Sequence, residues 1–110
     1  MESTEIEKIA RTEALFREVN ERIAEAAERF EATETSFVCE CADPRCTHRI
    51  EASLEQYERV REDGDTFLLV PGHEDKRVEA VVKNVDDHTV VEKRHPQVRR
   101  LVLALDPRGA

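Results

Sequence analysis

The chain has 110 residues, of which 39% are hydrophobic, 5% aromatic and 38% charged. This length fits one domain with a thin core, which a metal ion or an oligomer interface would stabilise. The net charge is −8, and an acidic body argues against sequence-independent binding to nucleic acid and against binding to anionic membranes. A basic surface on a protein partner, or a metal ion, suits this charge better.

The first predicted element is a long helix over about residues 4–31. No Gly or Pro lies between Thr4 and Phe30, and Thr4 and Glu7 have the spacing of a capping box. A seven-residue spacing predicts one stripe along this helix, formed by Ile9, Phe16, Ile23 and Phe30, with Thr12, Val19 and Ala26 between them. We expect the stripe to pack on the protein's own sheet, and the alternative is the seam of a homodimer.

Acidic and basic side chains at i,i+4 spacing predict a solvated face on the same helix. The pairs are Glu7–Arg11, Glu13–Arg17, Glu18–Arg22 and Glu25–Arg29. Each pair contributes only about 0.2–0.5 kcal/mol to helix stability, so the prediction depends on their number.

Short strands and one short helix follow. Residues 35–41 and 47–52 predict the two strands of an antiparallel hairpin, joined through a turn at Asp43-Pro44. Ser53 and Gln56 form a second capping box, which begins a helix that ends near Glu62. Residues 66–70 predict a strand, and residues 77–93 predict two strands joined at residues 84–88.

Together these elements predict an α+β fold. In it, the long N-terminal helix packs on a small antiparallel sheet that has a cysteine-bearing zinc hairpin and a second short helix. We expect residues 1–93 to form a single zinc-stabilised domain. Residues 94–110 carry four basic residues, one acid and two prolines around a short apolar patch, which predicts a basic, flexible tail.

Three cysteines, Cys39, Cys41 and Cys46, lie within eight residues. Residues i and i+2 of a strand point to the same face, so Cys39 and Cys41 can present their sulfurs together, and the following turn returns Cys46 toward them. Three thiolates supply most of the tetrahedral shell of a Zn²⁺ ion. Buried inert thiols and a redox-sensing cluster are the alternatives to a structural zinc site.

A fourth zinc ligand must come from elsewhere in the chain. His73 follows the tight turn Pro71-Gly72 directly after a strand, where an imidazole can be aimed rigidly, and we expect it to complete a Cys₃His shell. His48 is closer to the cysteines in sequence and remains an alternative. His88 and His95 rank lower, because they lie in a turn and in the tail.

Residues 13–93 also carry a characteristic order of short segments. They are residues 16–23, Phe37-Val38-Cys39-Glu40-Cys41 with Cys46, residues 57–61, Phe67, Pro71-Gly72-His73-Glu74 and residues 90–93. In this order they resemble a group of small, mostly uncharacterised bacterial proteins with an F-V-C-E-C-x₄-C … P-G-H pattern. The resemblance implies that the cysteines and His73 belong to one recurring pattern, and it implies no activity.

We expect a cytoplasmic protein, because the chain shows no apolar stretch near 18 residues and no charged-then-apolar leader, and its cysteines are an odd, clustered set. We predict a structural zinc ion and a role as a protein-interaction or regulatory module without catalytic activity. A thiol and zinc redox sensor is the alternative. A zinc-dependent hydrolase, with Glu40 or Glu74 as general base, is less consistent with a chain that lacks an H-E-x-x-H pattern.

Overall fold

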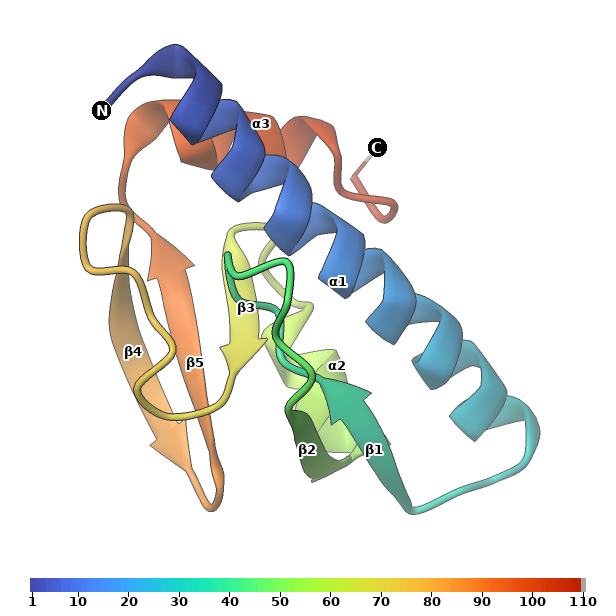
Figure 1. Cartoon of the computed structure of the whole chain (residues 1–110). Coiled ribbons are helices and arrows are strands. Elements are labelled where there is room, and N and C mark those ends of the chain that lie inside the picture. The colour runs from blue at the N-terminus through green and yellow to red at the C-terminus, as the bar shows by residue number, and fades with distance from the viewer. Residues whose placement is uncertain (110) are drawn as a thin grey trace.

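The structure is a computed structural model that describes residues 1–109, and these residues have an α+β fold. The elements are α1 (Ser3–Arg29), β1 (Glu34–Val38), β2 (Arg49–Ser53), α2 (Leu54–Val60), β3 (Thr66–Leu69), β4 (Glu79–Val85), β5 (His88–Lys93) and α3 (Pro96–Ala104). Figure 1 shows the long helix α1 lying across the strands, with α3 beside its N-terminal half. The predicted fold class is confirmed, but the strands of residues 1–109 form two separate sheets, β1–β2 and β3–β5–β4, where we expected one.

Both predicted hairpins form, and local sequence explains each of them. In the first, β1 pairs antiparallel with β2, and Phe37 lies opposite Ile50. In the second, β4 pairs antiparallel with β5 across a turn in which Asp86 has a φ of 50°, a value that Asp tolerates better than most residues. The interpretation of residues 77–93 as two strands is therefore confirmed.

The two predicted capping boxes have opposite outcomes. At the start of α2, the Gln56 amide donates to Ser53 Oγ at 3.0 Å, and the Ser53 amide donates to Gln56 Oε1 at 2.8 Å, so this box is confirmed. The box predicted at Thr4 is wrong. The N-cap of α1 is Glu2, two residues before Thr4, and its side chain makes no capping hydrogen bond within the described chain, while Glu7 pairs with Arg11 instead.

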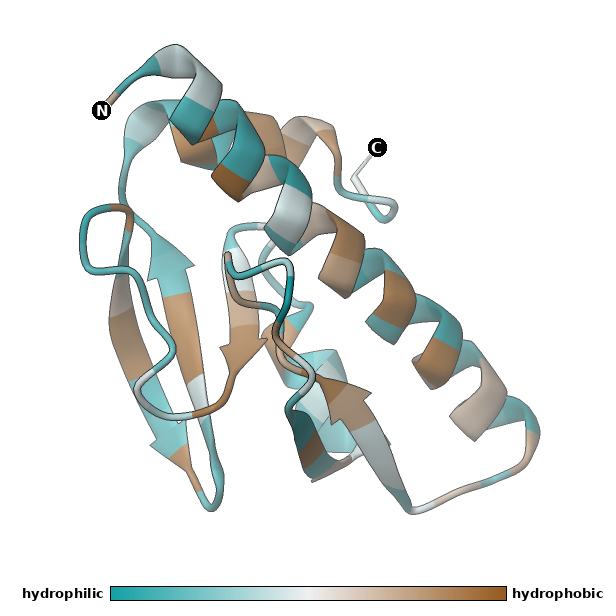
Figure 2. Cartoon of the chain, viewed as in Figure 1, coloured by the Kyte–Doolittle hydropathy of each residue, from teal (hydrophilic) through white to brown (hydrophobic). Residues whose placement is uncertain are grey.

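Helix α1 turns only part of its predicted apolar stripe toward the core. Phe30 is 77% exposed and Val19 is 38% exposed, while Phe16 and Ile23 are half-buried. Hydrophobic and hydrophilic residues alternate along α1 (Figure 2). The buried residues of α1 are Ile6, Ile9, Ala10, Glu13, Ala14, Arg17, Asn20, Glu21, Ala24 and Ala27. Alanines let the sheets approach the helix closely, and the polar residues among them find partners across the core. The prediction that the stripe packs on the protein's own core is therefore confirmed for Ile9 and for the half-buried Ile23, and it is wrong for Val19 and Phe30.

The predicted Glu13–Arg17 pair is wrong for the same reason, since both side chains point into the core and bind other groups. Arg17 donates to the carbonyl oxygens of Gly64 and Val102, at 2.6 and 2.7 Å. The Lys93 ammonium lies 2.7 Å from Glu13 Oε2 and also binds Glu79. The Arg17 guanidinium and the Lys93 ammonium both lie over the ring of Phe67, at 4.3 and 4.4 Å from its centre, in the cation–π range.

The C-terminal segment is a docked helix, which corrects the prediction of a flexible tail. Pro96 occupies the first turn of α3, where proline is tolerated, and the His95 ring accepts a hydrogen bond from the Gln97 amide. Val98 and Val102, at i,i+4 spacing, are fully buried, and the bond from Arg17 to Val102 ties α3 to α1. Residue 110 of the predicted tail lies outside the described residues.

The buried cluster of Glu13, Glu79 and Lys93 makes stability depend on pH. Two carboxylates share one ammonium away from water, and burial raises the pKa of Glu13 from 4.5 to about 8. Between these values Glu13 holds a proton in the folded protein and has lost it in the unfolded chain. The contribution of Glu13 to the free energy of unfolding therefore decreases as pH rises, by up to about 1.4 kcal/mol per pH unit.

We expect Glu13→Gln to flatten this pH dependence, because glutamine keeps the hydrogen-bonding shape and cannot ionise. The measurement is urea unfolding at a series of pH values between about 5 and 8. Glu18→Gln, on the solvent side of the same helix, is the matched control and should keep the wild-type slope. A wild-type slope in Glu13→Gln would contradict the assignment.

Candidate metal centre

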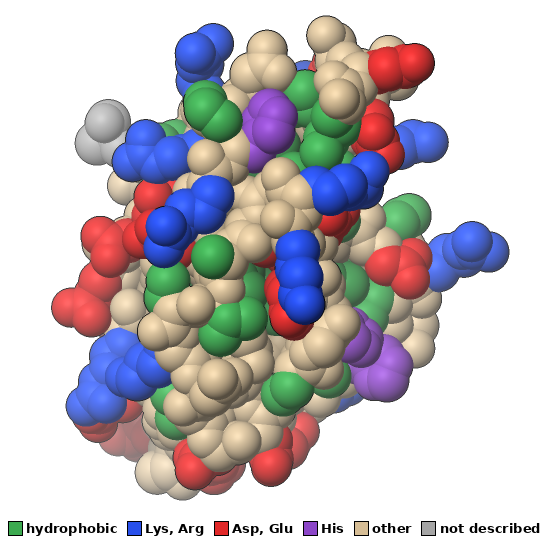
Figure 3. All heavy atoms as spheres, turned by 90° about the vertical axis from the view of Figure 1, so that its left-hand side faces the viewer, with side chains coloured by type: hydrophobic (Ala, Val, Ile, Leu, Met, Phe, Trp, Pro, Cys, Tyr) green, Lys and Arg blue, Asp and Glu red, His purple; other side chains and the backbone are tan. Residues whose placement is uncertain are grey.

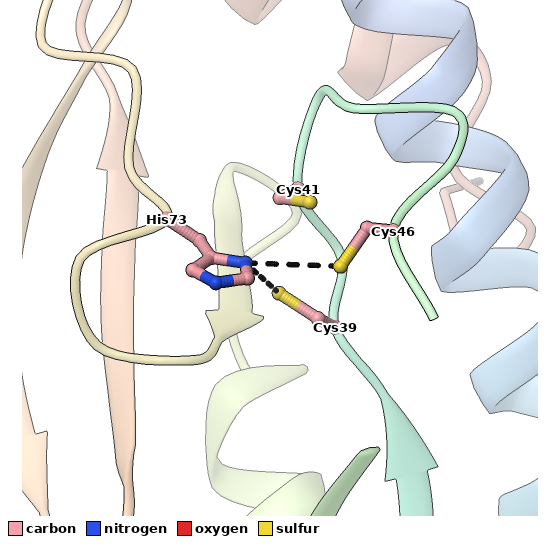
Figure 4. A group of neighbouring side chains, drawn as sticks. All are labelled: Cys39, Cys41, Cys46 and His73. Atoms are coloured by element: carbon pink, nitrogen blue, oxygen red, sulfur yellow. Dashed lines mark hydrogen bonds between the residues drawn. The ribbon is translucent and has the colours of Figure 1, made fainter. Parts of the chain in front are cut away.

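Four potential metal ligands from separate parts of the chain meet at one point. Cys39 and Cys41 follow β1, Cys46 lies in the loop before β2, and His73 follows β3 (Figure 4). One ligand atom from each residue lies within 4.8 Å of all the others. His73 Nδ1 lies 3.6 Å from Cys39 Sγ and 3.7 Å from Cys46 Sγ. The structure thus brings together the four residues that the sequence singled out.

The hairpin tip that carries the cysteines is shaped by its own backbone. Strand β1 ends at Val38, so the predicted strand over residues 35–41 is too long, and both Cys39 and Cys41 lie in the loop that follows. The Cys39 amide still donates to the His48 carbonyl, at 3.2 Å, which extends the hairpin by one pair. The Cys46 amide then donates to the Asp43 carbonyl at 3.0 Å, and this turn returns the third sulfur to the first two.

The loop of His73 is joined to the cysteine loop by a hydrogen bond from a backbone amide to a sulfur, and it is closed by a bond of its own backbone. The Val70 amide donates to Cys39 Sγ at 3.2 Å, and the His73 amide donates to the Val70 carbonyl at 3.0 Å. Gly72, between them, has a φ of 89°, which other residues rarely adopt. An amide that donates to a cysteine sulfur also stabilises the thiolate form, as the hydrogen-bonding partners of metal ligands commonly do.

Glu40 connects the cysteine loop to the rest of the fold, and the sequence analysis missed this role. Its side chain is fully buried, with Oε1 accepting from the Leu68 amide at 2.9 Å and Oε2 accepting from the Asn20 side chain at 2.8 Å. Asn20 also bonds both the amide and the carbonyl of Val38, at 2.8 Å each. Burial raises the pKa of Glu40. Both oxygens of Glu40 are thus engaged in bonds to β3 and to α1.

The other histidines take different positions. The His48 ring lies beside the His73 ring, with centres 4.8 Å apart and planes nearly perpendicular, but His48 is not among the four residues that converge. His88 is buried on β5, and His95 stands at the start of α3. Of the candidates, His73 is therefore the imidazole that faces the sulfurs.

Three thiols packed together favour the loss of one proton and oppose the loss of more. The hydrogen bond with Cys39 is the main cause that lowers the pKa of Cys41 to about 5, while the same contact, together with burial, raises the pKa of Cys39. Burial also raises the pKa of Cys46. A cation among the sulfurs would remove the repulsion between thiolates, so the group could hold a metal ion.

Comparison of the chain with protein-family models, curated proteins and solved structures found no match. The resemblance to the bacterial group stays a prediction, and the chemistry of the site is argued from its own side chains. No helix within residues 1–109 is both long and apolar enough to cross a membrane.

We expect Asn20→Ala to lower the free energy of unfolding by about 2–3 kcal/mol. The substitution leaves the Val38 backbone groups and one oxygen of Glu40 without their partner inside the protein. Urea unfolding measures the effect, and Gln97→Ala, at an exposed position of α3, is the control with a loss below about 1 kcal/mol. Equal losses in the two variants would show that the Asn20 bonds do not hold the junction.

Proposed function

We propose that Cys39, Cys41, Cys46 and His73 bind one structural zinc ion, and that the protein acts as a zinc-stabilised interaction or regulatory module without catalytic activity. The observation that carries this proposal is the convergence of four ligand atoms within 4.8 Å of one another.

The spacing of the ligand atoms supports zinc in particular. In a tetrahedral site, Zn–S bonds of about 2.3 Å and Zn–N bonds of about 2.0–2.1 Å place sulfur and nitrogen roughly 3.6 Å apart. His73 Nδ1 lies 3.6 and 3.7 Å from the sulfurs of Cys39 and Cys46. Zinc can therefore enter with little movement of these side chains. Three thiolates and an imidazole also form one of the common structural zinc shells, whereas Mg²⁺ and Ca²⁺ prefer oxygen ligands.

A closed shell supports a structural role over hydrolysis. Four protein ligands leave no position for the water that a zinc hydrolase activates. Of the two candidate bases, Glu40 is bonded to Asn20 and Leu68, away from any role in proton transfer. Glu74 remains beside His73, with no water to activate in a four-ligand shell.

The position of the centre explains why a small acidic chain would use it. The ion would link the tip of the β1–β2 hairpin to the loop after β3, and these belong to different sheets. A metal bond between two sheets supplies folding energy that a thin core lacks. Reduced thiolates also suit the cytoplasm, where we place the protein.

We expect protein purified without added metal to contain one zinc ion per chain. Elemental analysis of a folded sample gives the ratio, and removal of zinc by a chelator should lower the melting temperature. Cys46→Ser and His73→Ala each remove one ligand and should weaken zinc binding by at least about 100-fold. His48→Ala is the matched control and should retain zinc, because its ring lies beside His73 but outside the four. A folded sample with almost no metal would refute the proposal.

A redox-controlled zinc site is the second candidate, and the partial exposure of Cys46 supports it, because an oxidant can reach this sulfur. Hydrogen peroxide would oxidise two bound thiolates to a disulfide. The sulfurs give up two electrons, the peroxide takes these with two protons to form two waters, and zinc leaves the site.

We expect mild peroxide to release zinc and to lower the protein mass by two hydrogens relative to the three-thiol form. A chromogenic chelator follows zinc release, and mass spectrometry under denaturing conditions detects the disulfide. Addition of a thiol reductant and zinc should restore the site. If zinc is retained through peroxide treatment and the protein mass is unchanged, the redox-controlled site is contradicted and only the structural role remains.

A further inference from the structure

The solvent side of α1 carries an apolar surface that the fold covers only in part. We call it the outer stripe of α1, formed by Leu15, Phe16, Val19, Ile23 and Phe30. Leu15 is 62% exposed and Phe30 is 77% exposed, Phe16 is half-buried, and Ile23 is half-buried because part of it packs against the core. From Leu15 to Phe30 the stripe runs about 22 Å along the helix, which is the length of a typical helix–helix contact.

This surface differs from other exposed apolar side chains of the protein. Val81 and Val82 on β4 are also exposed, at 39% and 45%. On the side of the molecule seen in Figure 3, however, hydrophobic areas are small and separated by charged side chains of both signs. Scattered apolar residues are normal on protein surfaces, whereas a continuous stripe along a helix marks an interaction site.

The row of the helix beside Val19 carries bases at three of its four positions. Lys8, Arg22 and Arg29 share the seven-residue spacing of Leu15, so all four lie in one row beside Val19. All three bases are exposed. Arg22 pairs with Glu18, at 3.5 Å, but Lys8 and Arg29 make no salt bridge with any residue in the range 1–109. On a chain with a net charge of −8, this border is a local basic row.

A second copy of the protein does not fit this surface. In a parallel pair of helices, the basic row would meet the row on the other side of the partner's stripe, which is Glu13, Asn20 and Ala27. These three residues are buried in the core and cannot contact a partner. In an antiparallel pair, the basic row would meet its own copy, and like charges repel. The homodimer considered from the sequence is therefore disfavoured at this surface.

An anionic membrane also fits poorly. Amphipathic helices that lie on membranes carry many bases on their polar face and few acids. The polar side of α1 carries Glu7, Glu18 and Glu25 next to its bases, and the whole protein is acidic. A protein segment with acids along only one edge can pair these acids with the basic row. Unlike a membrane, it does not also bring negative charge against the acidic residues of the protein.

We propose that the outer stripe of α1 binds an amphipathic helix of another protein, with apolar side chains along one face and carboxylates along the edge that meets Lys8, Arg22 and Arg29. This inference depends on the proposed interaction role and not on the zinc ion. The apolar contact supplies affinity, and the charged border selects the partner and its direction.

Synthetic peptides test the chemistry of the partner. The probe is a fluorescein-labelled peptide of about four heptads, with Leu at the apolar positions and Glu along one of the two edges that flank them. One control peptide has Lys in place of every Glu, and another has Ser in place of every Leu. By fluorescence anisotropy on zinc-loaded protein at low salt, we expect the Glu peptide to bind at least ten times more tightly than either control. Salt should reduce the difference between the Glu and Lys peptides, because it screens surface charges.

Protein variants locate the binding surface. The double variant Leu15→Ser/Val19→Ser should weaken binding of the Glu peptide by about tenfold or more, while Val82→Ser, the matched control on β4, should leave it unchanged. Arg22→Glu/Arg29→Glu should reverse the preference, so that the Lys peptide binds better. All these positions are exposed, and circular dichroism melting should remain as in the wild type.

Several outcomes would overturn the proposal. Equal binding of the Glu and Lys peptides would remove the role of the basic row, and wild-type binding by Leu15→Ser/Val19→Ser would remove the stripe. Binding to phosphatidylglycerol vesicles without binding to the Glu peptide would assign the surface to a membrane. A solution mass of two chains that falls to one in the same variant would assign it to a second copy. Zinc content is measured separately by elemental analysis, so a failure of this proposal does not contradict the proposed zinc site.

Discussion

Helix α1, the cysteine loop and β3 meet at the buried carboxylate of Glu40. One oxygen accepts from the Leu68 backbone, the other from Asn20, and the Glu40 amide donates to the Leu68 carbonyl at 2.8 Å. These bonds join two sheets that share no strand pairing within residues 1–109. Burying a carboxylate costs free energy unless both oxygens accept hydrogen bonds. The bonds to Glu40 therefore stabilise its buried carboxylate and at the same time join the three segments to one another. Because Glu40 lies between Cys39 and Cys41, the direction of both sulfurs depends on this junction.

Features that depend on a few neighbouring residues could be predicted from the sequence. The Ser53–Gln56 box, the hairpin turns and the convergence of Cys39, Cys41 and Cys46 all follow from short-range spacing. His73 could be named because a turn after a strand aims a side chain, and because three sulfurs lack a fourth partner. Helix α3 was missed, although Val98 and Val102 gave a visible signal, because proline and several bases suggested a mobile segment.

The face that α1 buries could not be predicted, because the reasons for it lie far away in the chain. Lys93 binds Glu13 across 80 residues, and Arg17 reaches the carbonyl of Val102 across 85. Seven-residue spacing reports only where apolar side chains lie on a helix. In this helix the seven-residue row runs along the border between the inner and outer sides, so Ile9 is buried and Phe30 is exposed, while alanines and bonded charges form much of the inner side. The amphipathic pattern therefore indicated the helix but not the face that it buries.

The spacing of the four ligands along the chain bears on the order in which the molecule folds. Three sulfurs lie within eight residues, so a zinc ion could be captured by the hairpin tip while most of the chain is still disordered. His73 lies 34 residues beyond Cys39, and closing that loop costs more entropy than closing the hairpin tip. The segment between them contains α2 and β3, so the fourth ligand comes from the second sheet. A bond to it would thus report that the second sheet has docked against the first.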